Sequence, residues 1–474
     1  MRYAEGAREQ HTRESNDGLA VVIMAAGLGK RMKSALPKVL HRMCGRTLLD
    51  FVLGEVSGLG AGDVVVVVGL GAGEVSGLVG DRARCVVQAE QNGTGHAVMV
   101  AIEGLDPGLE EVLVLPGDAP LIRRSTLQSL LDARRSGAAA ASLLTAELDD
   151  PSGYGRVIRD GAGGAGRVIE EADASSDERA VREINACTYA FDRAPLETAL
   201  RALTTDNAQG EFYLTGVVQE FAEKGLGVVP VPGPAEEALG VNDREQLAAA
   251  CAIMRARING ALMLKGVSLL DPERTYIDYG VEVGRDTSIM PLVFLTGASR
   301  VGAGCRVGPC SEINDTVIGD GCEISFSWLD GCEVAGGATI GPYSRLRPGC
   351  RVGPGCKVGS FVEMKNTALG AGSKVPHLSY LGDAVIGEDV NVGAGSITCN
   401  YDGEHKHQTT IGDRAFIGSD TMLVAPVKIG EDAVTGAGSS IYEDVPDGNL
   451  GIERTEQKNV RGWRDRKKKH GRDR

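Results

Sequence analysis

A glycine-rich turn with two adjacent cations, IMAAGLGKRM at residues 23–32, has the composition of a phosphate-binding loop. It follows the apolar run LAVV, which predicts a buried strand that leads into the turn. Gly27 and Gly29 let the backbone approach a phosphate, and Arg31 brings a fixed positive charge to it. Met32 replaces the third glycine of the dinucleotide-binding fingerprint, and Arg31 replaces the Ser or Thr of a P-loop. The turn therefore predicts a phosphate site of another kind.

Two further residues have side chains suited to catalysis. Asp118 lies in PGDAP, directly after an apolar run, where an isolated aspartate is usually only a turn residue. His377 lies in VPHLSYLGDA, and a neutral imidazole near pH 7 is able to accept a proton. A lone histidine beside an aliphatic turn is more often structural, so the residue type alone leaves both interpretations open.

Composition limits the class of protein. A chain of 474 residues is too long for one ordinary core and predicts two or three domains. The net charge of -14 argues against a general nucleic-acid binder, and no apolar run approaches the length of a membrane span. The eleven cysteines form no CxxC pair and no zinc spacing, which indicates free buried thiols in a reducing cytoplasm.

Residues 20–245 alternate strand-like runs with helical stretches, for example VVVVVG at 64–69 and VLVLPGDAPL at 112–121. This alternation predicts an α/β domain with a mainly parallel sheet. The loops after the carboxyl ends of its strands are then expected to build the site.

After about residue 280, aliphatic residues recur every six positions. A helix cannot keep a stripe with this period, so each repeat predicts a short strand and a turn. The pattern is typical of a parallel β-helix built from hexapeptide repeats. The aliphatic positions are Val283, Ile289, Leu295, Val301, Val307, Ile313, Ile340, Leu346, Val352, Val358, Met364, Ile411, Ile417, Leu423, Ile429 and Ile441.

Five segments follow from these patterns. We expect a disordered leader at 1–19, a first domain at 20–245, a helical linker at 246–270, a β-helix domain at 271–456 and a basic tail at 457–474. The leader lacks the apolar region of a signal peptide. CNYDGEHKHQTT, at 399–410, interrupts the repeats and is expected to project as an external loop.

The order of the motifs resembles one bacterial family, the bifunctional N-acetylglucosamine-1-phosphate uridyltransferases and glucosamine-1-phosphate N-acetyltransferases. The matching motifs include AAGLGKRM, LPKVLH, QAEQNGTGHA, PGDAPL, DPSGYGRV, NAQGEFYLT, GVND, RLRPG, FVEMKN, VPHLSYLGDA, NVGAGSITCNYDG and GAGSSI, and they cover residues from about 20 to 463. The resemblance implies a Rossmann-like nucleotidyltransferase domain, a connecting helix and a left-handed parallel β-helix. It also implies a cytoplasmic homotrimer with active sites between subunits.

For the first domain, the resemblance implies UTP as substrate and Mg²⁺ as cofactor. Arg31 and Lys38 are then expected to hold the charge of the leaving pyrophosphate, and Asp118 and Asn242 to bind the metal. Sparse oxygen ligation suits Mg²⁺, which keeps waters and takes ligands from substrate phosphates. The residues expected to bind UTP or the UDP-sugar are Ala26, Gly27, Gly29, Lys38, Gln88, Gly93, Thr94, Asp118, Gly155, Glu170, Asn185 and Asn242.

For the β-helix, the resemblance implies acetyl transfer from acetyl-CoA to glucosamine 1-phosphate. His377 is the expected base, and Glu363 is expected to orient or polarise it. The amino sugar is expected to contact Arg347, Lys365, Tyr380 and Asn391. The residues expected to bind acetyl-CoA are Ala394, Asn400, Tyr401, Ser419, Ala437 and Arg454, and Arg461 and Trp463 are expected to reach a neighbouring subunit's acetyl-CoA site.

Two alternatives remain open. One is a single-activity sugar-nucleotide pyrophosphorylase with a non-catalytic β-helix, and the other is an inactive sugar-nucleotide binding or scaffold protein. Two positions also depart from the family pattern, since Cys187 stands where glycine is usual and Gly216 where Asp is common. The first departure is expected to alter the wall of the sugar pocket.

Overall fold

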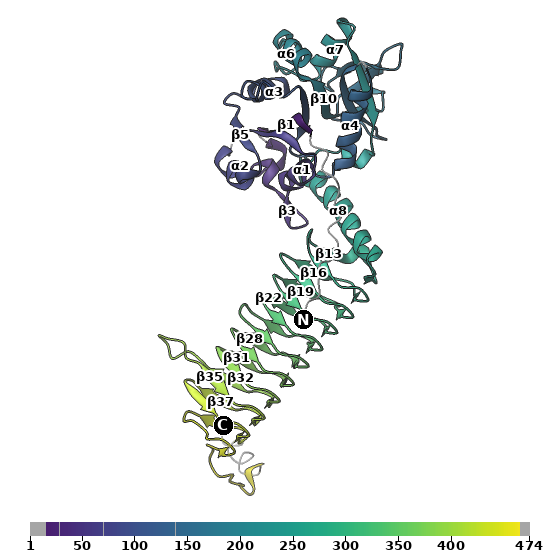
Figure 1. Ribbon diagram of the computed structural model, residues 1–474. Coiled ribbons are helices and arrows are strands. Elements are labelled where there is room, and N and C mark those ends of the chain that lie inside the picture. Colours follow the sequence, from purple (N-terminus) through teal and green to yellow (C-terminus); the bar gives the residue numbers. More distant parts are fainter. Residues whose placement is uncertain (1–15, 28, 70, 138, 465–474) are drawn as a thin grey trace, which may run out of the picture. The chain divides into compact units, whose positions relative to one another are not determined.

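The computed structural model describes residues 16–27, 29–69, 71–137 and 139–464, and the chain divides into two compact units, Met1–Met254 and Arg255–Arg474 (Figure 1). The first unit contains a sheet with the strand order β11-β7-β10-β6-β1-β4-β5. Strand β10 runs antiparallel to both neighbours, and the other neighbouring pairs on this path are parallel. The predicted α/β fold with a mainly parallel sheet is confirmed.

The elements of the first unit alternate along the chain. Its strands are β1 (Asn16–Ala25), β2 (Arg42–Met43), β3 (Arg46–Thr47), β4 (Ala61–Val68), β5 (Arg84–Val87), β6 (Glu111–Pro116), β7 (Ala139–Glu147), β8 (Arg156–Arg159), β9 (Ala165–Ile169), β10 (Glu183–Asp192) and β11 (Gly227–Pro232). Its helices are α1 (Leu48–Ser57), α2 (Ala72–Val79), α3 (Thr94–Ile102), α4 (Arg124–Ser136), α5 (Ser176–Arg179), α6 (Arg193–Ala202) and α7 (Gly216–Glu223).

Strand β1 lies inside the sheet and is buried on both faces. Its side chains alternate between two apolar clusters, with Ala20 and Val22 in one and Val21 and Ile23 in the other. Helices cover both faces of a sheet of this kind, which explains the continuous apolar run before the phosphate loop.

The predicted leader at 1–19 is wrong at its carboxyl end, because β1 already begins at Asn16. The Asn16 backbone N–H donates to the Gly60 carbonyl at 3.1 Å, and its side chain donates to the Leu59 carbonyl at 2.6 Å. Leu19 is fully buried. Residues 1–15 of the predicted leader lie outside the described residues.

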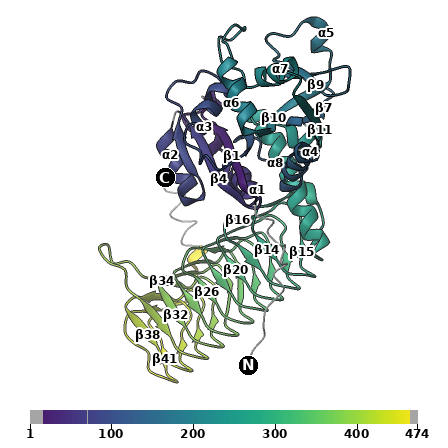
Figure 2. The same ribbon diagram turned by 45° about the horizontal axis from the view of Figure 1, so that its top comes forward.

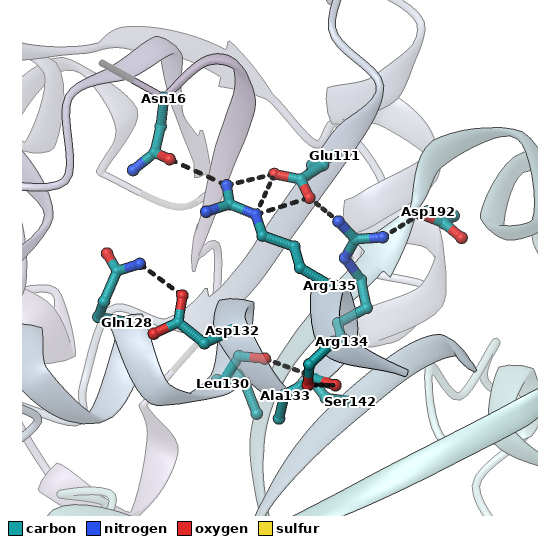
Figure 3. A network of polar contacts seen from close by, with 11 residues as sticks. Asn16, Glu111, Gln128, Leu130, Asp132, Ala133, Arg134, Arg135, Ser142 and Asp192 are labelled. Carbon is teal, nitrogen blue, oxygen red and sulfur yellow. Dashed lines mark hydrogen bonds and ion pairs between the residues drawn. The ribbon is translucent and has the colours of Figure 1, made fainter. Parts of the chain in front are cut away.

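A charged network holds the sheet at the edge where β1 and β6 begin (Figure 3). Arg135 of α4 donates to Asn16 at 2.9 Å and, through Nε, to both oxygens of Glu111 at 2.9 and 3.1 Å. Its neighbour Arg134 binds Glu111 and Asp192, and burial lowers the pKa of Arg134. Arg134 and Glu111 each have two partners of opposite charge, which compensate the cost of burying them. This network therefore stabilises the sheet at its amino edge and leaves the carboxyl edge available for a site.

The second unit is a parallel β-helix in which one strand per coil joins each of three sheets (Figure 2). The first sheet contains β12 (Ser268–Leu269), β15 (Ser288–Ile289), β18 (Arg306–Val307), β21 (Glu323–Ile324), β24 (Thr339–Ile340), β27 (Lys357–Ser360), β30 (Lys374–His377), β33 (Asn391–Val392), β36 (Phe416–Ile417), β39 (Val434–Thr435) and β41 (Leu450–Gly451). The second contains β13 (Thr275–Ile277), β16 (Val293–Thr296), β19 (Ser311–Asn314), β22 (Trp328–Asp330), β25 (Arg345–Leu346), β28 (Glu363–Lys365), β31 (Tyr380–Gly382), β34 (Ile397–Cys399), β37 (Met422–Val424) and β40 (Ser440–Ile441). The third contains β14 (Glu282–Val283), β17 (Arg300–Val301), β20 (Val317–Ile318), β23 (Glu333–Val334), β26 (Arg351–Val352), β29 (Ala368–Leu369), β32 (Ala384–Ile386), β35 (Thr409–Ile411) and β38 (Val427–Ile429).

The aliphatic positions predicted from the sixfold period form the core of the β-helix. All of them are buried except Val283, which is partly buried and packs against the same core. The period is interrupted after Ile313 because the next buried aliphatic residues are Ile318, Ile324, Leu329 and Val334, with several spacings of five. The β-helix prediction is confirmed. The sixfold period is lost where one face of a coil contains five residues.

Buried cysteines occupy corner positions inside the coils. Their thiols point at carbonyls of the next coil, with Cys305 Sγ 3.2 Å from the Gly319 oxygen and Cys356 Sγ 2.9 Å from the Gly370 oxygen. At Thr287, the side-chain hydroxyl donates to the Gly302 carbonyl of the next coil in the same way. Small polar groups at these corners therefore satisfy backbone oxygens. The expectation of a buried thiol is wrong for Cys310, which is exposed.

Helix α8 (Arg244–Leu264) lies largely within the predicted linker at 246–270. Its end covers the first coil, since Leu262 belongs to the β-helix core and Asn259 donates to the carbonyls of Pro272 and Thr275 at 2.7 and 3.0 Å. Strand β12 already belongs to the β-helix, so the linker ends earlier than expected. Among the described residues, α8 is the one helix that is long and apolar enough to cross a membrane, judged by length and composition alone. Core helices of soluble proteins pass the same test.

The insertion at 399–410 projects from the coils as predicted. Its residues are mostly exposed, and Tyr401 pairs with Lys406 in an antiparallel bridge. Asp402 accepts backbone N–H groups from Glu404 and His405 at 2.8 and 2.6 Å, which lowers its pKa. The loop therefore has a defined turn of its own.

Candidate functional sites

A cavity of about 620 Å³ lies at the carboxyl ends of β1, β5 and β6 in the first unit. Open α/β sheets bind ligands at this edge. The cavity brings together every residue expected at the nucleotide site, although these positions are scattered from residue 26 to residue 242. They are Ala26, Gly27, Gly29, Arg31, Lys38, Gln88, Gly93, Thr94, Asp118, Gly155, Glu170, Asn185 and Asn242.

The phosphate loop continues into a short 3-10 turn, Lys30–Met32, rather than into an α-helix. Gly29 has φ of 56°, in the left-handed region, and a Cβ there would lie 2.9 Å from Lys38 Cβ. Glycine is therefore required for both conformation and space. Met32, which excluded the dinucleotide fingerprint, is buried and anchors the turn, while Arg31 remains exposed at the cavity.

The two expected metal ligands face one cation. Lys38 Nζ forms an ion pair with Asp118 and donates to Asn242 Oδ1 at 3.0 Å. The Val241 N–H donates to the Asp118 carbonyl at 2.9 Å and joins GVND to the PGDAP turn. An ammonium group between two oxygens shows that they can serve a cation. Among the described residues, no cluster of three or more His, Cys, Asp or Glu forms a complete metal cage, so an ion here would need substrate oxygens.

Another part of the cavity lining is polar and contains Asn185 and Glu170. Asn185 donates to the Tyr189 hydroxyl at 2.7 Å and accepts from the Cys187 N–H at 3.0 Å. Glu170 accepts from the Thr215 hydroxyl at 3.2 Å, and burial raises the pKa of Glu170. The lining therefore offers a carboxyl group that holds its proton to a higher pH than an ordinary glutamate does.

Replacing Glu170 with glutamine is expected to change how stability depends on pH. The pKa of Glu170 in the folded protein lies above the ordinary value of 4.5, which applies to the unfolded chain. At pH values between the two, folding is accompanied by uptake of a proton. The parent's stability should therefore fall as pH rises through this window, and that loss should be absent in Glu170→Gln. Unfolding temperatures measured across pH test this, with exposed Glu223→Gln as control. Parallel curves for the parent and Glu170→Gln would contradict the assignment.

Two departures from the family pattern lie in this region. Cys187 lines the cavity with φ of 56°, and burial raises the pKa of its thiol to about 12, so the thiol stays protonated near neutrality. Its backbone conformation explains why glycine suits this position. Gly216 begins α7, where an added Cβ would lie 2.8 Å from Leu203 Cδ2. A side chain at Gly216 would require Leu203 to move.

A second group of predicted residues gathers on the second sheet of the β-helix. Arg347 donates to Glu363 at 3.1 Å. Arg347 directly follows β25, and Glu363 begins the neighbouring strand β28. Lys365 lies 3.8 Å from Asp383, which accepts from Asn400 at 2.6 Å. The sequence led us to expect that Glu363 orients or polarises His377. In the structure, the carboxylate of Glu363 accepts a hydrogen bond from Arg347.

Lys406 belongs to this group but was missed in the sequence. The inserted loop brings it beside Lys365, and contact with that second ammonium group lowers the pKa of Lys406. Two neighbouring ammonium groups make a site for an anion such as phosphate. Its position inside EHKHQ gave no signal, because only the fold of the loop sets its distance from Lys365.

The expected acetyl-CoA residues include a column on successive coils. The Asp420 N–H donates to the Ala394 carbonyl at 2.7 Å, and the Gly438 N–H donates to the Ser419 carbonyl at 2.8 Å. Arg454 closes this column by donating to the Ala437 carbonyl at 3.0 Å. His377 is exposed at the end of β30. The column consists of Ala394, Ser419, Ala437 and Arg454, and the loop carries Asn400 and Tyr401.

One corner of the β-helix exposes large apolar side chains, although its backbone is left-handed. This apolar corner consists of Leu292, Phe326, Tyr343, Phe361 and Leu378, with φ between 46° and 61°. The rings of Tyr343 and Phe361 stack at 5.3 Å. Equivalent corners use mostly glycine, Asn or Asp, such as Gly304, Gly321 and Gly337. Left-handed backbone costs about 1–2 kcal/mol for other residues, so this apolar corner is retained at an energetic cost.

The fold and the first cavity define a nucleotidyltransferase joined to a hexapeptide-repeat transferase. Two family models agree, the MobA-like NTP transferase domain at residues 21–208 and the bacterial transferase hexapeptide (six repeats) at 408–443. The chain belongs to the family of the bifunctional protein GlmU, whose members are nucleotidyltransferases and acetyltransferases.

Relatives named bifunctional protein GlmU match over nearly their whole length. The protein of Pelobacter propionicus is 49% identical over 458 residues, which cover 96% of this chain and 99% of the relative. That of Caldanaerobacter subterraneus subsp. tengcongensis is 47% identical over 454 residues, with the same coverage. That of Thermoanaerobacter pseudethanolicus is 45% identical over 456 residues, covering 96% of this chain and all of the relative.

Proposed function

We propose that the chain makes UDP-N-acetylglucosamine in two steps, each carried out by one unit. The β-helix transfers an acetyl group from acetyl-CoA to glucosamine 1-phosphate. The first unit then couples the product to UTP and releases pyrophosphate. The observation that carries this proposal is the presence of both residue sets in one chain, one lining the cavity and the other gathered on the coils.

In the first unit, positioning and charge are sufficient for the reaction. The sugar phosphate oxygen attacks the α-phosphorus of UTP, and the bond to the β-phosphate oxygen breaks. Arg31, Lys38, Glu170 and Asn185 all line the cavity. In this proposal, Arg31 and Lys38 hold the negative charge of the departing pyrophosphate, and Glu170 and Asn185 orient the acetamido sugar. Asp118 and Asn242 would hold the metal, proposed as Mg²⁺, which supplies charge neutralisation at the phosphates.

In the β-helix, the sugar amine attacks the thioester carbon, and the carbon–sulfur bond then breaks to release coenzyme A. His377 accepts the amine proton on a ring nitrogen. Arg347, Lys365 and Lys406 bind the sugar phosphate, with Tyr380 and Asn391 as further sugar contacts. The coil column and the inserted loop bind acetyl-CoA through Ala394, Asn400, Tyr401, Ser419, Ala437 and Arg454.

The rival proposal is a pyrophosphorylase whose β-helix only supports assembly. It offers no reason for lysines of two separate segments, Lys365 and Lys406, to meet beside Asn400 and Asp383. It predicts uridylyl transfer without acetyl transfer, so separate assays of the two reactions distinguish the proposals. We further propose a cytoplasmic enzyme that binds no nucleic acid.

The apolar corner supports a homotrimer. Contiguous exposed apolar surface marks contact with another protein, and strained residues persist where a contact compensates them. We propose that this surface, which ends at Leu378 beside His377, packs against a second copy, so that acetyl transfer needs the assembly. Arg461 and Trp463 are proposed to reach a neighbouring copy's acetyl-CoA site.

Replacing Tyr343 and Phe361 together with aspartate is therefore expected to yield monomers. Acetyl transfer should fall at least about tenfold because charges in an apolar interface cost several kcal/mol, while uridylyl transfer should continue. Light scattering coupled to size exclusion measures the assembly. Val317→Asp, at an exposed position on the third sheet, is the control and should stay trimeric. A trimeric double variant, or a monomeric parent, would contradict this role.

A further inference from the structure

The ammonium group of Lys38 lies where the proposed function requires a metal ion. It contacts both Asp118 and the Oδ1 atom of Asn242, and the side chains of Lys38 and Asp118 are only 14% and 15% exposed. The backbone of Lys38 is held firmly, since Val39 and Leu40 follow it into the core. Its four-carbon stem remains flexible, so the ammonium group can move while the backbone stays fixed.

We propose that Lys38 is a positioning residue that holds the two metal ligands and is displaced by the incoming divalent ion. Without a cation, the mostly buried Asp118 carboxylate would be an unpaired charge, which is costly. Asn242 has one side-chain oxygen, and that oxygen already accepts from Lys38. A divalent ion that uses the same oxygen must therefore move the lysine, because two cations on one oxygen repel each other.

Displacement gives Lys38 a second position. Its ammonium group leaves the carboxylate and becomes available to phosphate oxygens in the same cavity, which also contains Gly29 and Arg31. The ion and the triphosphate then favour each other's binding, because the ion frees the Lys38 ammonium group and the triphosphate binds that group. Such coupling is reciprocal for the two binding equilibria. This step rests on the proposed function, which assigns Asp118 and Asn242 to the metal.

Binding of Mn²⁺ to the full-length protein without nucleotide tests the displacement. Free Mn²⁺ is measured by electron paramagnetic resonance for the parent, Lys38→Met and Lys30→Met. Lys30 lines the same cavity, so its variant makes the same charge change without removing the contact to Asp118. Lys38→Met should bind Mn²⁺ about tenfold more tightly than the parent, because the site is then no longer mostly occupied by lysine. Lys30→Met should bind like the parent.

The double variant Lys38→Met/Asp118→Asn separates the two ways of failing. It should lose the tight binding. Tight binding that survives in it would overturn the ligand assignment and the displacement with it. Equal affinity of the parent and Lys38→Met, both weakened by Asp118→Asn, would overturn displacement alone.

The remaining outcomes are also decisive. If Lys30→Met tightened binding as much as Lys38→Met, general charge would explain the effect and displacement would be wrong. Absence of Mn²⁺ binding in Lys38→Met would likewise overturn it, because removing the competitor must expose the site. Circular dichroism and the unfolding temperature of each variant show whether the first unit, which contains all three substituted residues, is folded.

Discussion

Replacing His377 with alanine is expected to lower acetyl transfer by about 10²–10⁴-fold and to leave uridylyl transfer unchanged. The amine must lose a proton as the new amide forms, and a positioned imidazole ring nitrogen accepts it. His377 is exposed on the coils, next to Leu378 of the apolar corner. Rates of the two reactions are measured separately on the same preparation.

The matched control for this prediction is His405→Ala. His405 is an exposed histidine of the inserted loop, and its backbone N–H binds Asp402 at 2.6 Å, a contact that alanine keeps. It should retain most acetyl transfer. Undiminished acetyl transfer in His377→Ala would show that another group accepts the proton, and an equal loss in both variants would remove the special role of His377.

Asp118→Ala is expected to lower uridylyl transfer by about 10²–10³-fold or more and to leave acetyl transfer intact. The variant removes the carboxylate that faces Lys38 and Asn242, so the cavity loses the charge that holds a cation beside the phosphates. The release of pyrophosphate from UTP and N-acetylglucosamine 1-phosphate measures the effect.

An aspartate that acts only in a turn provides the comparison. Asp106 accepts the Gly108 N–H at 2.8 Å at an exposed position, which is the role that Asp118 would have if PGDAP were an ordinary turn. Asp106→Ala should leave both reactions near the parent rate. If Asp118→Ala behaved in the same way, the metal assignment would be wrong.

The sequence predicted the β-helix because buried aliphatic side chains repeat with the coil. Where a face shortens to five residues, as between Ile313 and Ile318, the period fails although both residues stay buried. The antiparallel direction of β10 was not predicted, because strand direction depends on contacts between distant segments. The start of β1 was missed because polar Asn16 gave no strand signal, and its pairing with distant segments decides its structure.

The candidate sites were predicted unevenly. The phosphate loop, Asp118 and Asn242 belong to recognisable motifs, and the cavity does bring them together. The contact of Lys406 with Lys365 and that of Glu363 with Arg347 join segments that are distant in the sequence. No local sequence pattern predicts such contacts, because they depend on which coils lie side by side. The apolar corner escaped notice because apolar side chains usually predict burial, whereas here a left-handed corner turns them outward.

Conversion of glucosamine 1-phosphate by the purified parent protein tests the central claim most directly. With acetyl-CoA and UTP both present, the chain is expected to form UDP-N-acetylglucosamine, pyrophosphate and free coenzyme A. Omitting UTP should stop the reaction at N-acetylglucosamine 1-phosphate, and omitting acetyl-CoA should prevent formation of the nucleotide sugar. Formation of UDP-N-acetylglucosamine from supplied N-acetylglucosamine 1-phosphate, without any acetylation of glucosamine 1-phosphate, would contradict the two-step account.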